Sequence, residues 1–356
     1  MNVGTKAAAE RQQALRAVHF ERRAIVCALA VGALAAASPA GAQPAGRPKR
    51  VALVFLSEPL SDMSGPDPPE PSLRAFVRRL RELGWVEGRN LVIERHTAEG
   101  RREQLADLMR QMVALGVDVI VTGATGAVAA AQVTDRTPIV ATFGGDPRQS
   151  GLTDSLARPT RNVTGVAVDT GEGILGKRLQ LLHEAAPAAT RVAVIDFPYV
   201  DARLSPGVQS RRLELEAAAR ALGITLVPVG VSGVDGFDAA FASLAGRRVD
   251  ALFDVGIYYA QRQRILDFAA GQRLPAIHPA REYAEAGGLI AYGANAVRAW
   301  RRMAEQTDRI LRGAKPADVP FEQPTHFELV INARTARALG LNLPPALLLR
   351  ADDVIE

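Results

Sequence analysis

Short apolar runs and helical stripes of apolar residues alternate along the chain from residue 50 onwards. The runs are rich in β-branched side chains and too short to form helices, which is typical of buried strands in a parallel sheet. They cover residues 51–55, 90–94, 117–121 and 138–143. The stripes have the spacing of amphipathic helices and cover residues 73–83 and 105–115. Strands that alternate with helices in this way predict βαβ units, and therefore an α/β fold.

The turn after the third of these strands is the most informative stretch. The strand stops at Gly123, and the alanine-rich residues 127–131 are expected to start a helix. A helix that begins just past the carboxyl end of a strand presents unpaired N–H groups and a positive dipole end, which together bind anions. Thr125 is expected to cap this helix, and Gly123 and Gly126 would let a ligand approach the backbone. An ordinary turn without a ligand fits the same residues, so both interpretations stay open.

The same order of elements occurs a second time. Residues 191–195 (RVAVI) echo residues 50–54 (RVALV) at an offset of 141, and three further echoes follow at offsets of 139, 132 and 137. The repeat predicts two similar Rossmann-like lobes, because its period is far longer than the roughly 20 to 50 residues of solenoid repeats. Extended segments connect the lobes and predict a three-strand hinge, of the kind that closes around a small ligand.

The repeat and the connecting segments predict how the chain is divided. The N-terminal lobe is expected to comprise residues 50–163 and 294–318. The C-terminal lobe is expected to comprise residues 166–290 and 325–356. The hinge is expected near residues 163–165, 290–293 and 319–325. Helices are expected over residues 296–311 and 333–339.

The N-terminus has the pattern of a secretory signal peptide. Arg22 and Arg23 precede the 14 apolar residues 24–37, and small residues follow up to Ala42, where cleavage is expected. This run is shorter than the roughly 20 residues of a membrane anchor. The arginine pair leaves Sec and twin-arginine export both open. The mature protein is therefore expected in the periplasm, without the only cysteine, Cys27.

Charge and motif spacing argue against nucleic-acid binding, a metal site and hydrolase chemistry. Loss of residues 1–42 reduces the formal net charge from +5 to +2, so the chain lacks the basic footprint of a nucleic-acid-binding protein. The four remaining histidines are scattered without metal-site spacing, and there is no G-x-S-x-G elbow. We therefore expect no catalytic residue, no cofactor and no bound metal.

Several motifs occur together in one order. They are RELGWVEGRNLVIE, VDVIVTGAT, TPIV, GDP, NVTG, GKRLQLL, LPAI, REYAEAGGLIAYG, GAKPADVPFEQPTHFELVINARTARALGL and PPALLLRADDVIE. Over residues 50 to 356 the chain thereby resembles the substrate-binding proteins of ABC importers, in the family that includes tryptophan- and tyrosine-type binders. The C-terminal block is the most distinctive part of the resemblance.

The resemblance implies a type I periplasmic binding protein fold. It also implies a monomer without catalytic activity that carries a small molecule, such as an aromatic amino acid or a related carboxylate, to an ABC permease in the inner membrane. A sensory or partner-docking protein with the same fold is the alternative, and an enzyme with its site in the cleft is a third hypothesis.

Candidate ligand-binding residues follow the strand ends and the family's motifs. The family's Gly-Thr-Pro-Ala-Ala turn appears here as Gly-Ala-Thr-Gly-Ala from Gly123, with threonine shifted and proline missing. The candidates are Ser57, Gly123, Ala124, Thr125, Phe143, Asp146, Phe197, Asp254, Tyr258 and Arg281. Asp146 is expected to accept from a ligand ammonium or to cap its own loop. The aromatic candidates stack on a ligand or serve as ordinary packing. Arg281 clamps a carboxylate or pairs with Glu282 or Glu285.

Overall fold

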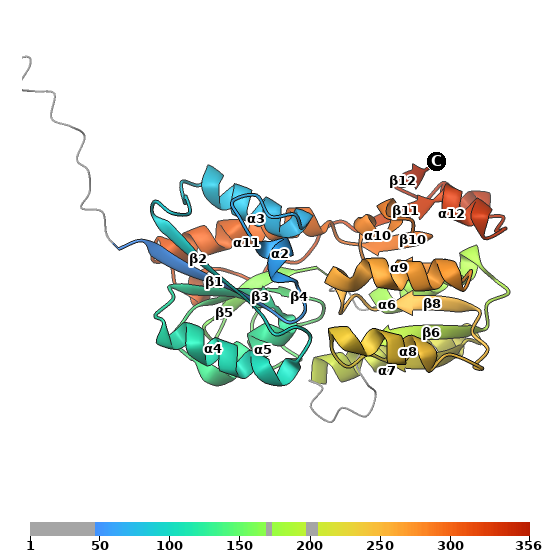
Figure 1. Ribbon diagram of the computed structural model, residues 1–356, viewed down its shortest axis with the longest axis horizontal. Coiled ribbons are helices and arrows are strands. Elements are labelled where there is room, and N and C mark those ends of the chain that lie inside the picture. Colours follow the sequence, from blue (N-terminus) through green and yellow to red (C-terminus); the bar gives the residue numbers. More distant parts are fainter. Residues whose placement is uncertain (1–46, 169–172, 197–205) are drawn as a thin grey trace, which may run out of the picture. The chain divides into compact units, whose positions relative to one another are not determined.

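The computed structural model describes residues 47–168, 173–196 and 206–356. Residues 48–356 fall into one unit, in which strands alternate with helices (Figure 1). The expected signal peptide and the candidate Phe197 lie outside the described residues. Within the described ranges, no helix is both long enough and apolar enough to cross a bilayer.

The first sheet has five parallel strands in the order β2-β1-β3-β4-β5. They are β1 (Lys49–Phe55), β2 (Leu91–Thr97), β3 (Val119–Gly123), β4 (Ile139–Phe143) and β5 (Val163–Ala167). The helices between them are α2 (Leu60–Met63), α3 (Pro71–Glu82), η1 (Arg102–Gln104), α4 (Leu105–Ala114) and α5 (Ala124–Val133).

The second sheet has seven strands in the order β7-β6-β8-β9-β10-β11-β12, all parallel to their neighbours except that β11 runs antiparallel to β10. They are β6 (Arg191–Asp196), β7 (Thr225–Gly230), β8 (Ala251–Asp254), β9 (Ala276–His278), β10 (Ile290–Gly293), β11 (Glu328–Asn332) and β12 (Asp353–Ile355). The helices that follow this sheet's strands or precede them are α6 (Ile174–Ala185), α7 (Pro206–Ala221), η2 (Val234–Gly236), α8 (Phe237–Ala242), η3 (Tyr259–Gln261), α9 (Arg262–Gly271), α10 (Arg281–Glu285), α12 (Ala333–Ala338) and α13 (Pro345–Leu348).

The repeat in the sequence corresponds to a repeat in topology. The order β2-β1-β3-β4-β5 recurs as β7-β6-β8-β9-β10. Even a polar contact recurs, because the N–H of Arg50 donates to Asp118 at 2.8 Å and the N–H of Arg191 donates to Asp250 at 3.0 Å. The prediction of an α/β fold with two Rossmann-like halves is confirmed.

The first sheet is covered on both faces. Helices α3 and α11 (Ala296–Leu311) pack together on one face, and α4 and α5 pack on the other (Figure 1). Helix α11 follows the five strands β6–β10 of the second sheet, yet its Met303 and Ile310 are buried in one apolar cluster with Val51 and Phe76. The chain then passes through the 3-10 turn η4 (Pro316–Asp318) to β11 in the second sheet.

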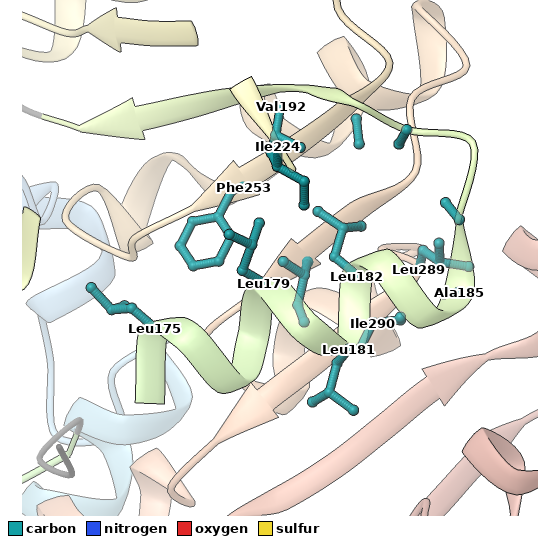
Figure 2. Packing of buried hydrophobic residues seen from close by; sticks show 14 of the residues in the cluster. Leu175, Leu179, Leu181, Leu182, Ala185, Val192, Ile224, Phe253, Leu289 and Ile290 are labelled. Carbon is teal, nitrogen blue, oxygen red and sulfur yellow. The ribbon is translucent and has the colours of Figure 1, made fainter. Parts of the chain in front are cut away.

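The second sheet buries its largest apolar cluster beneath α6. Leu175, Leu179 and Leu182 of this helix face Val192 and Phe253 of the sheet (Figure 2). Full burial of each such leucine stabilises the folded chain by roughly 1.5 to 3 kcal/mol. Helices α8 and α9 belong to a separate cluster on the opposite face.

Two of the segments expected to connect the lobes are strands of the sheets. Residues 163–167 form β5 and residues 290–293 form β10. Their glycines are required by close neighbours, since a Cβ at Gly165 would lie 1.9 Å from the carbonyl oxygen of Ala141, and one at Gly293 would lie 1.7 Å from that of Pro279. The exact lobe and hinge limits stay a prediction.

Candidate functional site

A cavity of about 360 Å³ lies at the carboxyl ends of the parallel strands. Its walls come from both sheets: from the residues that end or follow β1, β3, β4 and β5 in the first, and β6, β8, β9 and β10 in the second. This volume is within the range of small-molecule sites, and strand ends are where open α/β sheets bind ligands. The cavity is therefore the candidate site.

The N-terminus of α5 opens onto this cavity. Gly123, Ala124, Thr125 and Gly126 all line it. Gly123 is the N-cap and no side chain caps the helix, so the N–H groups of the first turn have no partner within the helix. Together with the helix dipole, they provide an anion-binding wall.

The expectation that Thr125 caps this helix is wrong, because the helix begins at Ala124, directly after the strand, and Thr125 lies in its first turn. Gly126 has a packing role in addition to its place in the cavity wall. A Cβ there would lie 1.9 Å from Oγ1 of Thr122, whose hydroxyl donates to the carbonyl of Val54 at 2.5 Å. Only glycine lets α5 approach β3 this closely.

Aromatic side chains form part of the apolar wall. Phe55, Phe143 and Trp300 line the cavity. The Trp300 ring lies 5.4 Å from that of Phe55 and 6.0 Å from that of Phe76, while Phe143 packs edge-on against Phe321 at 5.3 Å. These rings are fixed by their neighbours and present a preformed surface to a planar ligand.

Arginines from the second sheet's helices reach the same cavity. Arg178 of α6 is fully buried and its Nε donates to the carbonyl of Tyr292 at 2.7 Å. On α7, Arg212 donates from Nε to Oδ2 of Asp196 at 2.7 Å. Arg211 of α7 also lines the cavity, and so does Arg102 of η1 in the first half. The side of the cavity formed by α6 and α7 is therefore rich in fixed positive charge.

Two carboxyl groups lie in the wall formed by the first sheet. Glu58 follows β1, and Glu70 is the N-cap of α3, with its Oε2 accepting the N–H of Leu73 at 2.6 Å. Burial raises the pKa of Glu58, the N–H groups of Ser57 and Glu58 lower it, and the nearby charge of Glu70 raises it again, so that the net shift is upward. When ionised, these two carboxylates carry the opposite charge to the arginines.

The structure brings half of the predicted site residues together. Ser57, Gly123, Ala124, Thr125 and Phe143 all line the cavity. Phe197 lies outside the described residues. Asp146, Asp254, Tyr258 and Arg281 do not line the cavity, and each has partners within the protein.

Asp146 binds its own loop. It accepts from the backbone N–H of Arg148 at 2.9 Å and pairs with the same guanidinium at 2.6 Å. Burial favours the neutral acid, but these bonds outweigh it and hold the pKa of Asp146 below its usual range. The capping alternative for Asp146 matches this geometry.

Asp254 and Tyr258 are enclosed in the second half. Asp254 is 1% exposed, accepts the N–H of Gly256 at 2.8 Å and lies 3.5 Å from Nδ1 of His278. The Tyr258 hydroxyl donates to the carbonyl of Val231 at 2.7 Å, and burial raises its pKa to about 12. Its neighbour Tyr259 is the tyrosine that lines the cavity.

Arg281 joins three elements of the second half. Its guanidinium contacts Glu328 at 3.1 Å and Asp353 at 2.7 Å, with Glu285 at 3.5 Å. The hydrogen bonds that Arg281 donates to Asp353 and Glu328 raise its pKa, so the side chain stays charged. The ion-pair alternative with Glu285 is present, alongside two partners that are far away in the sequence.

Several cavity residues are absent from the sequence-based candidates. They include Glu58, Glu70, Arg102, Arg178, Arg211, Arg212 and Trp300. Glu58 and Glu70 could have been identified from the sequence. Glu58 follows a predicted strand end, and Glu70 directly precedes Pro71 at a helix start. The arginines carry no such signal, since they occupy helix positions that look like an ordinary solvated face.

The chain is similar to known proteins over most of its length. Residues 72–355 match a family described as ABC transporter substrate binding protein. The tyrosine-binding protein of Clostridioides difficile (strain R20291) is 24% identical over 271 residues, which are 75% of this chain and 76% of that protein.

Two solved structures share the fold. A conserved domain protein from Vibrio cholerae has a TM-score of 0.72 at 24% identity, covering 86% of this chain and 100% of that chain. The ABC domain in complex with L-Trp from Streptococcus pneumonia has a TM-score of 0.70 at 23% identity, with the same coverage of 86% and 100%.

Proposed function

The chain belongs to the ABC transporter substrate-binding protein family and has its bilobed type I periplasmic binding fold, and from this premise we propose that it captures an aromatic amino acid, or a related carboxylate, in the cavity. The observation that carries the proposal is the position of this cavity, where the strand ends of both sheets meet the open N-terminus of α5. The protein acts by binding its ligand and not by converting it.

The cavity offers a distinct partner for each part of such a ligand. The N–H groups at the start of α5 and the hydroxyl of Thr125 suit a carboxylate. Trp300 and Phe143 provide apolar surface for an aromatic ring, at roughly 0.5 to 1.5 kcal/mol per aromatic pair beyond area burial. The named relatives that bind tyrosine and L-Trp support this ligand class.

The biological setting follows from the family and from the N-terminal sequence. Substrate-binding proteins of this family typically work outside the cytoplasm. We propose that residues 1–42 are removed on export and that the mature chain, a monomer, delivers its ligand to an ABC permease. The lobes comprise residues 50–163 with 294–318 and residues 166–290 with 325–356, and they close around the ligand by bending near 163–165, 290–293 and 319–325.

A thermal-shift panel tests the proposed function. The purified protein is heated with each of the twenty amino acids, with purines and with small carboxylates, and native mass spectrometry identifies any molecule that co-purifies. We expect aromatic amino acids to raise the melting temperature, because a ligand that binds only the folded state stabilises it. A response confined to purines or aliphatic compounds would overturn the ligand class.

A variant then locates the site. Thr125→Ala is expected to weaken ligand binding by about fivefold, equivalent to about 1 kcal/mol for one lost hydrogen bond. Thr137→Ala, on the same half but outside the cavity lining, is the matched control and should bind as the parent does. Equal affinities for all three proteins would place the ligand elsewhere.

A further inference from the structure

We propose that the wall formed by Glu58, Glu70 and Ser72 is a subsite for a protonated amine of the ligand. The inference rests on the proposed function, in that it takes the cavity as the ligand site, and it adds the chemical group that this wall selects. The ligand is then an aromatic amine, with the ammonium of an amino acid as its simplest form. The carboxylate of such a ligand is a second and separable anchor.

One carboxylate oxygen of Glu70 accepts no hydrogen bond from the part of the protein that the structure describes. The residue is only 6% exposed and lines the cavity. Its Oε2 caps α3, whereas its Oε1 is buried without a hydrogen-bond partner in the part of the chain that the structure describes. Such an atom has lost its water without gaining a hydrogen bond, and this cost, which is larger for a charged group, remains until a donor reaches it.

Ser72 lies two residues further along, in the first turn of the same helix. It is 3% exposed and lines the cavity, and its Oγ is also buried without a partner among the described residues. A carboxylate oxygen and a hydroxyl oxygen at one helix start therefore both lack donors. An ammonium group, with three N–H donors and no acceptor, supplies what these atoms need.

Glu58 adds a second negative charge to this wall. Its Oε2 accepts the N–H of Ser57 at 3.1 Å, and its charge interacts with that of Glu70. Among residues 47–168, 173–196 and 206–356, no lysine, arginine or histidine lies within salt-bridge distance of either carboxyl. Two like charges in a partly buried wall are unfavourable without a cation between them.

One residue of the second half adds a further acceptor to this part of the cavity. Tyr259 lines the cavity, and its hydroxyl is buried without a hydrogen-bond partner in the described structure. Burial, together with Glu282 and Glu70, raises the pKa of Tyr259, so the phenol stays neutral and its oxygen remains available as an acceptor. The guanidinium of Arg262 lies 4.8 Å from the ring centroid and stacks on its face.

The geometry favours an organic cation over a metal ion. In the described residues, no group of three or more His, Cys, Asp or Glu side chains is arranged to hold a metal. The cavity also contains Trp300, which packs against Phe55 of β1 and Phe76 of α3; Glu58 follows the first of these elements and Glu70 caps the second. Carboxylates beside an indole ring are a favourable environment for an alkylammonium group.

Titration calorimetry with matched ligands tests the subsite. The purified protein is titrated with L-tryptophan, tryptamine, which lacks the carboxylate, and indole-3-propionate, which lacks the amine. The tyrosine series of L-tyrosine, tyramine and 3-(4-hydroxyphenyl)propionate is run in parallel. We expect loss of the amine to weaken binding by at least about tenfold, because a charge-assisted bond to a buried carboxylate is lost. Tryptamine or tyramine should bind measurably.

Variants separate recognition of the amine from a structural role. Glu70→Gln and Glu58→Gln should each weaken binding of the amines and amino acids by about tenfold while leaving the amine-free acids unchanged. Glu103→Gln, an exposed glutamate outside the cavity lining, is the matched control. Weakening of amines and amine-free acids alike by both variants would overturn the subsite.

The remaining outcomes distinguish this inference from the proposed function. If the amine-free acids bind as tightly as the amino acids, the proposed function stands and the amine subsite is wrong. If none of the six compounds binds, the proposed ligand class is wrong and the inference is overturned with it.

Discussion

Arg212 and Asp196 form an ion pair in the wall of the cavity, with Nε of the arginine 2.7 Å from Oδ2 of the aspartate. The two side chains are only 10% and 6% exposed. The pair fixes the first part of α7 to the carboxyl end of β6. Because both charges are largely removed from water, the pair is costly to break.

Removing one partner should therefore be costly. Asp196→Ala is expected to lower the free energy of unfolding by about 3 kcal/mol, since the buried guanidinium loses this carboxylate. Urea denaturation of the unliganded protein measures this. Asp67→Ala is the control, because the Arg78–Asp67 pair is 55% and 48% exposed and such pairs contribute less than about 1 kcal/mol. Equal losses in the two variants would contradict the prediction.

The turn between β3 and α5 gives a steric prediction. Gly126→Ala is expected to lower the free energy of unfolding by about 1 to 3 kcal/mol, because its methyl group collides with Thr122. In Gly123→Ala the nearest atom would be Oγ1 of Thr142 at 3.9 Å, so this variant should be nearly neutral in the unliganded protein. Chemical denaturation compares the two.

A double variant checks the cause. Thr122→Ala removes the hydroxyl that the new methyl group meets, so Thr122→Ala/Gly126→Ala should lose less stability than the two single variants added together. If the losses in the free energy of unfolding were strictly additive, the collision with the Thr122 hydroxyl would not be the cause.

Glu58 predicts a pH-dependent change in stability. Its pKa is raised above the ordinary value of 4.5, so the folded chain binds a proton more tightly than the unfolded chain. Ionisation therefore lowers stability above the folded pKa, and this cost disappears below the ordinary value. Glu58→Gln should raise the melting temperature of the unliganded protein at neutral pH, with a gain that shrinks towards acid.

Melting curves between about pH 4 and about pH 8 measure the effect. The exposed Glu103→Gln is the matched control and should show no such trend. A gain for Glu58→Gln that grows as the pH falls would contradict the sign of the shift.

Arg281 is predicted to act on stability and not on ligand affinity. Its partners Glu328 and Asp353 lie on β11 and β12, so Arg281→Ala should loosen the C-terminal strands and cost about 1 kcal/mol, as expected for a partly exposed pair. Ligand affinity measured by calorimetry should stay unchanged. An Arg281→Ala protein with normal stability and weakened binding would instead identify this residue as a carboxylate clamp.

The fold was predictable where local pattern and repetition agree. The apolar runs at residues 51–55 and 117–121 correspond to β1 and β3, and Asp118 and Asp250, at equivalent places in the repeat, make the same contact in each sheet. Helix α11 spans Ala296–Leu311, the range expected from its apolar stripe. In each case the interactions that determine the element lie within one strand or one helix, or are repeated in both halves.

The candidate site was only partly predictable, because side-chain direction depends on tertiary packing. Tyr258 and Tyr259 are adjacent, yet the first turns into the core to reach Val231 and the second lines the cavity. Arg178 looks like a solvated helix position, yet it is buried in the cavity wall, where its Nε donates to the carbonyl of Tyr292. Backbone positions at strand ends, such as Gly123 and Ala124, were easier because topology alone puts them there.

The return of α11 to the first sheet limits when that half of the protein is able to fold. Met303 and Ile310 complete the apolar layer that also contains Phe76, but the ribosome makes them after the first ten strands. A nascent chain that ends at residue 168 still exposes that layer to water. The half that is synthesised first must therefore wait for the second half before its own interior is sealed.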